Sequence, residues 1–209
     1  MLEIAWKIFK EHWVVLTFAP LAAGFIQQIP SQVAQVVVSG AQLNPEAPEV
    51  MVITSLATIL GMVLQIFFSV GETRLYLQAA RGETPEFGVV FSGMDRFLPV
   101  LGTSLVVGLA VILGLVALII PGIILAYGLS FAVYLCVDEG CSPIEAAKRS
   151  WAITNGQKAN LFLLSVLGFL VMLLGLLACC IGVVPAASVV SVATAIVYLR
   201  ITGQSARAY

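Results

Sequence analysis

Four glutamines are the polar side chains that lie deepest in the apolar parts of this sequence. Gln28, Gln32 and Gln35 are spaced i, i+4, i+7, which places them on one face of a helix beside Pro30, and Gln65 lies in the next apolar stretch. These amides could line a path for a small solute or a lipid headgroup near the outer leaflet. They could also bond neighbouring helices or lie exposed at an outer helix end. We favour this second interpretation, because polar side chains commonly join helices in bilayers.

The other residues that could do chemistry are too few and too scattered for a catalytic or metal site. The single histidine, His12, lies far along the chain from the cysteines, which show no CxxC spacing. No HExxH helix, Ser–His–Asp set or phosphate-binding glycine loop can be assembled. We therefore expect no catalysis, no metal and no cofactor. The four cysteines, interpreted as small apolar side chains in a helix bundle, are Cys136, Cys141, Cys179 and Cys180.

The composition excludes a soluble protein. Of the 209 residues, 60% are hydrophobic and 10% are charged, with a formal net charge of −1. Soluble domains carry about 25% charged residues. A nucleic-acid-binding protein and a disordered chain are excluded by the same figures. The first charges, Glu3, Lys7, Lys10 and Glu11, are of mixed sign and make a poor secretory signal, so we expect the first apolar segment to be retained.

Four uncharged stretches predict six membrane-spanning helices, because one span needs about 20 apolar residues. The first two stretches each have room for one span, and the last two are each long enough for two. These stretches are 13–45, 50–71, 98–137 and 159–199.

Proline and glycine mark where the two long stretches divide. Pro121 and Gly122 interrupt the third stretch, and Gly182 and Pro185 interrupt the fourth. Proline removes a backbone donor, and glycine adopts the backbone conformations that turns require. The predicted spans are about 14–38, 50–80, 98–119, 123–138, 159–181 and 184–201.

The basic residues predict the orientation of these spans. All ten fall on one side of a six-helix serpentine, whereas the other side carries only Glu46 and Glu49. The positive-inside rule then places both termini in the cytoplasm. Six aromatic residues near the cytoplasmic helix ends predict an interfacial belt: Trp6, Trp13, Tyr76, Tyr134, Trp151 and Tyr198. The basic residues are Lys7, Lys10, Arg74, Arg81, Arg96, Lys148, Arg149, Lys158, Arg200 and Arg207.

A short motif recurs at the ends of the second and fourth predicted spans. It reads Tyr-Leu, four residues, Gly, two residues, Pro, with glycine ending one helix and proline opening the next. A degenerate copy, Tyr198-Leu199 followed by Gly203, ends the sixth span. The recurrence predicts pseudo-repeats of about 1–81, 82–139 and 140–203, with coincidence as the alternative because both features are common in membrane proteins. The motif residues are Tyr76, Gly82 and Pro85, then Tyr134, Gly140 and Pro143.

Each pseudo-repeat is predicted to begin with a short amphipathic helix on the cytoplasmic face. Apolar residues recur at helical spacing from Leu2 to Trp13, from Phe87 to Leu98, and from Ile144 to Trp151. Such helices could act as elbows that position each hairpin, or they could bind anionic lipid through their basic faces. We favour the elbow, because acidic residues accompany the basic ones.

The second half of the chain resembles a known group of proteins. The residues that carry the resemblance are the Pro121-Gly122 helix opening, Asp138, Pro143 and the 146–150 elbow, Ala-Ala-Lys-Arg-Ser. They resemble uncharacterised bacterial integral-membrane families related to the membrane domain of glycerophosphoryl diester phosphodiesterases, most clearly over residues 98–203. The resemblance implies a six-helix protein of the bacterial inner membrane with cytoplasmic elbows. It does not imply phosphodiesterase activity, which belongs to a separate soluble barrel in those proteins.

Together these observations predict an all-α membrane protein of six transmembrane helices, arranged as three hairpins that each follow a cytoplasmic amphipathic helix. Both termini are expected in the cytoplasm of a bacterium, with the chain in the inner membrane. We expect a non-catalytic structural, lipid-interacting or partner-binding role. The alternative is a transporter or channel-like protein for a small neutral solute or lipid. The expected partners are membrane lipids and a membrane protein, not nucleic acid, and the sequence makes no prediction of a homo-oligomer.

The topology can be tested with single cysteines placed in a background that lacks the four native ones. Ala41→Cys is expected to react with a membrane-impermeant thiol reagent added outside spheroplasts. Ala206→Cys is expected to react only after the membrane is opened, because the positive-inside rule puts it in the cytoplasm. Labelling of both positions from the same side would contradict the predicted topology.

Overall fold

A computed structural model describes residues 2–41, 44, 47–177 and 182–206, and these residues form helices and turns without a strand. Glu46, Cys179, Cys180 and Arg207, which enter the sequence predictions, lie outside the described residues. The α-helices are α1 Leu2–Gly40, α2 Pro48–Arg81, α3 Phe97–Ala117, α4 Ile119–Gly128, α5 Ala132–Glu139, α6 Pro143–Thr154, α7 Lys158–Leu177 and α8 Val183–Ile201. Two 3-10 helices, η1 Phe87–Phe91 and η2 Met94–Arg96, precede α3.

Six helical segments of the described chain are long and apolar enough to cross a bilayer. Five of them contain one α-helix each, namely α1, α2, α3, α7 and α8, and the fourth segment combines α4 with α5. The prediction of an all-α chain with six segments of membrane-spanning length is therefore confirmed.

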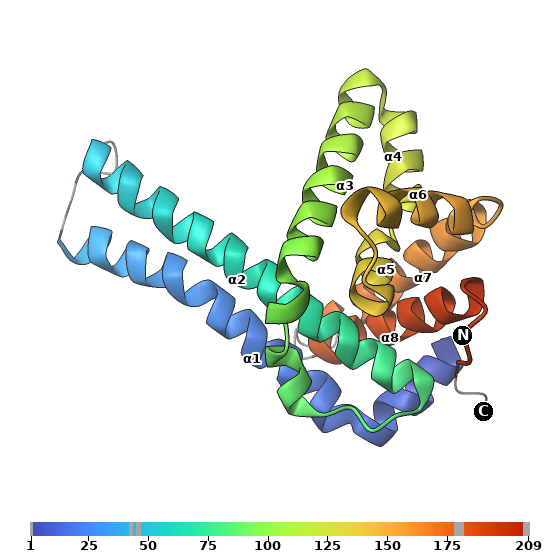
Figure 1. Ribbon diagram of the computed structural model, residues 1–209. Helices are drawn as coiled ribbons and strands as arrows, with labels where there is room; N and C mark the ends of the chain where they lie inside the picture. The colour runs from blue at the N-terminus through green and yellow to red at the C-terminus, as the bar shows by residue number, and fades with distance from the viewer. Residues whose placement is uncertain (1, 42–43, 45–46, 178–181, 207–209) are drawn as a thin grey trace.

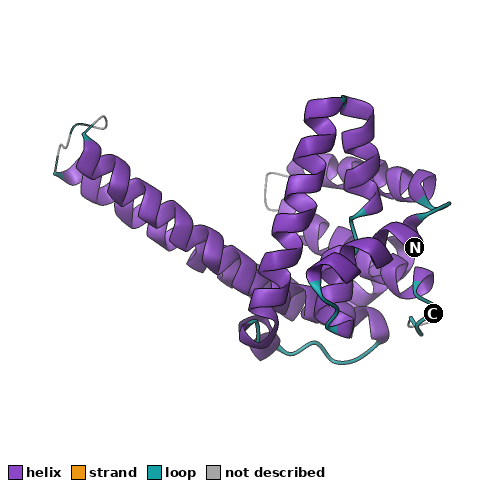
Figure 2. Ribbon diagram, turned by 45° about the horizontal axis from the view of Figure 1, so that its top comes forward, coloured by secondary structure: helices purple, strands orange, loops and turns teal. Residues whose placement is uncertain are grey.

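The helices form two arms and a common base. Helix α1 packs along α2, α3 along α4, and α7 along α8. The α1–α2 pair extends from the molecule as a long arm, and the α3–α4 pair leaves in a different direction (Figures 1 and 2). The buried core lies at the base, where α5, α8 and the near ends of α1 and α2 meet. Its largest fully buried side chains include Ile8, Leu16, Leu75, Leu135 and Tyr198.

The three predicted amphipathic elbows take three different forms. The first is continuous with α1, and the chain bends at His12, whose φ and ψ of −124° and 27° are non-helical. The second consists of the 3-10 helices η1 and η2, and its backbone lies close against α2. A Cβ on Gly71 would lie 2.2 Å from the Val90 carbonyl oxygen, and one on Gly93 would lie 2.1 Å from that of Phe67. The third is the regular helix α6.

The break within the third uncharged stretch lies earlier than Pro121-Gly122, so the predicted position was wrong. Leu118 is the extended residue that separates α3 from α4, with φ −164° and ψ 147°. Pro121 instead lies in the first turn of α4, where its missing N–H would have had no helical partner. Gly122 lets the two helices approach, because a Cβ there would lie 2.5 Å from the Leu115 side chain.

The fourth span is interrupted, whereas the sequence predicts one helix over 123–138. Helix α4 ends at Gly128 and α5 begins at Ala132, whose N–H donates to the Leu129 carbonyl instead of the Gly128 carbonyl. The Ser150 hydroxyl of α6 donates to that freed Gly128 carbonyl (3.0 Å) and accepts from the Phe131 N–H (3.2 Å). The Thr154 hydroxyl also lies 3.0 Å from the Gly128 oxygen. Side chains of α6 thus replace helical hydrogen bonds that the break removes.

Glycine and proline at the other predicted boundaries occupy the ends of helices. Gly182 immediately precedes α8, and Pro185 lies in its first turn. Gly82, Gly140 and Gly203 follow α2, α5 and α8 with φ of 85°, 73° and 72°, in the left-handed region that glycine adopts without steric cost. The three copies of the predicted motif therefore end their helices in the same way, and the division into pseudo-repeats stays a prediction.

The interrupted span yields a prediction of stability. Ser150→Ala is expected to lower the free energy of unfolding by about 1–3 kcal/mol, because it leaves the buried Phe131 N–H without its acceptor. Ser142→Ala is the matched control, since Ser142 precedes the same helix, is exposed and makes no side-chain cap. Unfolding in mixed micelles measures both variants, and equal losses for the two would contradict the role given to Ser150.

Candidate functional site

The structure does not gather the four glutamines into one lining. Gln32, Gln35 and Gln65 are exposed on the α1–α2 arm, away from the two cavities described below. Gln28 borders one of these cavities, between α1 and the start of α8. The four glutamines therefore do not form the polar lining that was considered for them. Gln28 contributes one amide at the end of an apolar groove.

The tyrosines and the tryptophans of the predicted interfacial belt lie in different surroundings. Trp6 and Trp13 are exposed by 47% and 52% on α1, as a belt requires. Tyr198 is fully buried, and its ring lies 5.4 Å from that of Tyr134. Tyr76 is buried as well. The rings of Tyr134 and Tyr198 pack against one another and against Phe131, so these two tyrosines belong to the core between the helix ends and not to the belt.

A buried carboxylate joins three helix ends at the base of the molecule. Asp138, at the end of α5, accepts a hydrogen bond from Arg81 at the end of α2 (2.6 Å). It also accepts from the Tyr198 hydroxyl of α8 (3.1 Å) and from the Gln204 amide (3.0 Å). Only 10% of the Asp138 side chain is exposed. We call Arg81, Asp138, Tyr198 and Gln204 the Asp138 cluster, and its hydrogen bonds compensate for the burial of the charge.

A second ion pair flanks the Asp138 cluster. Arg149 of α6 pairs with Glu139 and also donates to the Cys141 sulfur (3.3 Å). The hydrogen bond from Arg149 to Glu139 raises the pKa of Arg149, so this guanidinium stays charged. The Arg96 guanidinium covers Gly140, where a Cβ would lie 1.9 Å from its Nη1 atom. These contacts fasten α6 and the second elbow to the end of α5.

The sequence does not predict that Arg81, Asp138, Tyr198 and Gln204 meet, because Arg81 and Asp138 lie far along the chain from each other and from the other two. One feature of the sequence could have indicated the ion pair between Arg81 and Asp138. Arg81 follows Tyr76 by five residues, and Asp138 follows Tyr134 by four. Two opposite charges therefore lie at nearly the same position in the two copies of the recurring motif. The structure brings these two charges together.

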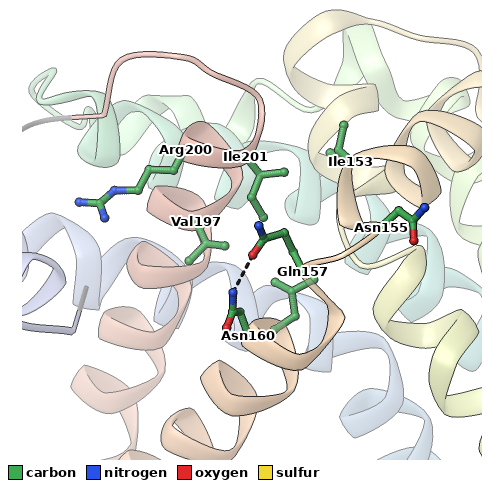
Figure 3. A pocket seen from close by; sticks show the side chains of 8 residues that line it. Ile153, Asn155, Gln157, Asn160, Val197, Arg200 and Ile201 are labelled. Atoms are coloured by element: carbon green, nitrogen blue, oxygen red, sulfur yellow. Dashed lines mark hydrogen bonds between the residues drawn. The ribbon is translucent and has the colours of Figure 1, made fainter.

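A cavity of about 480 Å³, lined by both polar and apolar residues, opens between the α6–α7 turn and the end of α8. Gln157 and Asn160 lie at its centre and hydrogen-bond to each other (2.6 Å) (Figure 3). The Arg200 guanidinium points away from these two amides. Because the amides bond each other and the cation is turned outward, this cavity presents no convergent set of groups for a charged ligand.

An apolar groove lies between α1 and the start of α8. Its first section, about 630 Å³, runs from Lys10 and Trp13 to Leu21. Its second section, about 430 Å³, continues from Leu21 to Gln28. Leu21 and Val184 border both sections, and we call the whole the α1/α8 groove. Within it, the buried Thr17 hydroxyl oxygen has no hydrogen-bond partner among the described residues.

Comparisons of the chain with protein-family models, characterised proteins and solved structures find no match. The resemblance to integral-membrane families related to the membrane domain of glycerophosphoryl diester phosphodiesterases therefore stays a prediction. The functional conclusion has to come from the composition, the fold and the groove.

The contacts of the Asp138 cluster predict that replacing Asp138 lowers the free energy of unfolding more than replacing Asp95. Asp138→Asn is expected to lower the free energy of unfolding by about 2 kcal/mol, because it leaves the partly buried Arg81 without its counter-charge. Asp95→Asn is the control, because Asp95 is 57% exposed where it pairs with Arg74 and such pairs contribute less than about 1 kcal/mol. Unfolding in mixed micelles provides the comparison. If Asp95→Asn lowered the free energy of unfolding as much as Asp138→Asn, the prediction would be wrong.

Proposed function

We propose that this chain is a non-catalytic, lipid-interacting protein that spans a bacterial inner membrane several times. The observation that carries the proposal is the exposed apolar surface of the long helices. Phe25, Leu105 and Phe169, on three of the long helices, are exposed by 73%, 65% and 67%. Water disfavours so large an exposed apolar area, whereas acyl chains accommodate it.

The proposed arrangement in the membrane is three hairpins with both termini on the cytoplasmic side. Its support is the separation of charge along the chain. The Asp138 cluster and the Arg149–Glu139 pair lie at helix ends at the base of the molecule, and all lysines and arginines belong to the same side of the serpentine. The opposite ends of α1 and α2 carry one described charge, Glu49.

Lipid is the proposed partner because the chain offers it two kinds of surface. The convex faces of the arms contact bulk acyl chains, and the α1/α8 groove offers an apolar concave surface. The predicted transport role would need a polar path, and the exposed positions of Gln32, Gln35 and Gln65 supply no lining for one here. The lipid-interacting role therefore takes precedence over transport.

The proposal is tested in native membranes. The full chain is expected to stay in the pellet after alkaline carbonate washing, because its spans are held by burial in hydrocarbon. When the chain is extracted in native lipid discs, particular lipid species are expected to be more abundant in the discs than in the bulk membrane, as measured by mass spectrometry. Release by carbonate, or a disc composition equal to the bulk, would contradict the proposal.

A flux assay in liposomes provides the complementary test of the transport alternative. No specific flux of a small neutral solute such as glycerol is expected. Flux that appears with the native chain and disappears when Gln28, Gln32 and Gln35 are replaced by leucine would establish the transporter and overturn the lipid-interacting proposal.

A further inference from the structure

The α1/α8 groove differs from the convex apolar surfaces of the arms in shape and in what lies at its end. Phe9, Trp13 and Leu21 line one side of this groove from α1, and Val184 and Pro185 line the other side from α8. The lining of the first section is almost entirely apolar apart from Lys10 and Thr17. A concave surface of this kind contacts one slender apolar chain on several sides at once.

The first section of the groove is long enough to hold part of one acyl chain. It is lined mainly by the part of α1 that follows the bend at His12. From Trp13 to Leu21 this helix advances eight residues, or about 12 Å at 1.5 Å per residue. Several methylene groups of an acyl chain can therefore lie alongside α1 in the groove.

The cytoplasmic end of the groove carries the features that a phospholipid headgroup needs. Lys10 borders the groove, is exposed, and has its ammonium group 5.3 Å from the centre of the Trp6 ring. Trp13, exposed by 52%, lies beside it. Tryptophan favours the headgroup level, and a lysine near the surface attracts anionic lipid. The cation at the mouth of an apolar groove thus complements the phosphate and acyl chain of one molecule.

We propose that the α1/α8 groove binds one phospholipid, with an acyl chain between α1 and α8 and an anionic headgroup at Lys10. The inference rests on the proposed function, since the lipid reaches the groove only if the chain spans the membrane. It adds to that function a defined site and a preference for negative charge.

The test uses the full chain in vesicles of phosphatidylcholine that contain a trace of photoreactive lipid. The probe is phosphatidylglycerol with a diazirine in its acyl chain, compared with the corresponding phosphatidylcholine. After irradiation, peptide mapping by mass spectrometry locates the adducts. We expect adducts concentrated on the residues that line the groove, relative to exposed residues of α3, and about fivefold more of them with the anionic probe than with the zwitterionic one.

Two variants and their controls separate the acyl-chain contact from the headgroup contact. Leu21→Trp, which fills the groove where its two sections meet, is expected to remove groove adducts from both probes. Lys10→Gln is expected to equalise the two probes while groove adducts persist. Leu105→Trp on the exposed face of α3 and Lys148→Gln on the exposed face of α6 are the matched controls, and neither is expected to change the groove signal.

The outcomes distinguish failure of the site from failure of the proposed function. Adducts spread evenly over the groove and the α3 arm, with no effect of Leu21→Trp, would overturn the site while leaving a membrane-spanning protein in place. Equal groove labelling by the two probes in the native chain would overturn the headgroup assignment. Absence of adducts on both the arms and the groove would overturn the membrane-spanning proposal itself.

Discussion

The need to satisfy backbone hydrogen bonds in apolar surroundings is the constraint on which this structure depends. Helices satisfy it within themselves, which is why the described chain is helical nearly throughout. The fourth span violates it between Gly128 and Ala132, and α6 supplies the remedy with the hydroxyls of Ser150 and Thr154. The Trp151 ring fits against Gly128, where a Cβ would lie 2.3 Å from it. Helix α6 and the interrupted α4–α5 segment therefore stabilise each other through these contacts.

The same constraint separates polar from apolar contacts along the molecule. Charged side chains gather where helices end, and the Asp138 cluster, the Arg149–Glu139 pair and the Arg74–Asp95 pair hold those ends together. The arms rely on apolar packing and on close approaches at glycine, as where Gly122 meets Leu115. The base is thus the part of the molecule with specific polar contacts, and the surface of the arms is mainly apolar.

The sequence allowed the number and the apolar character of the helices to be predicted, because the length of an uncharged stretch reflects bilayer thickness directly. It also allowed the helix-ending glycines to be predicted, since Gly82 and Gly140 have the left-handed conformation that few other residues adopt. It did not reveal the break at Gly128, because no proline or charge marks it. The groove was equally hidden, since Leu21 and Val184 are ordinary apolar residues that lie more than a hundred and fifty positions apart.

By itself, the sequence determined that this is a helical chain with six segments able to cross a membrane, and it predicted that the basic residues lie on one side of that membrane. These properties are local, because hydropathy and charge are summed along the chain. Only the tertiary structure decided that the motif tyrosines face inward, that Asp138 receives Arg81, and that α1 and α8 leave a groove ending at Lys10. Those properties depend on which helix faces meet, and contacts between distant residues of similar apolar character leave no local pattern in the sequence.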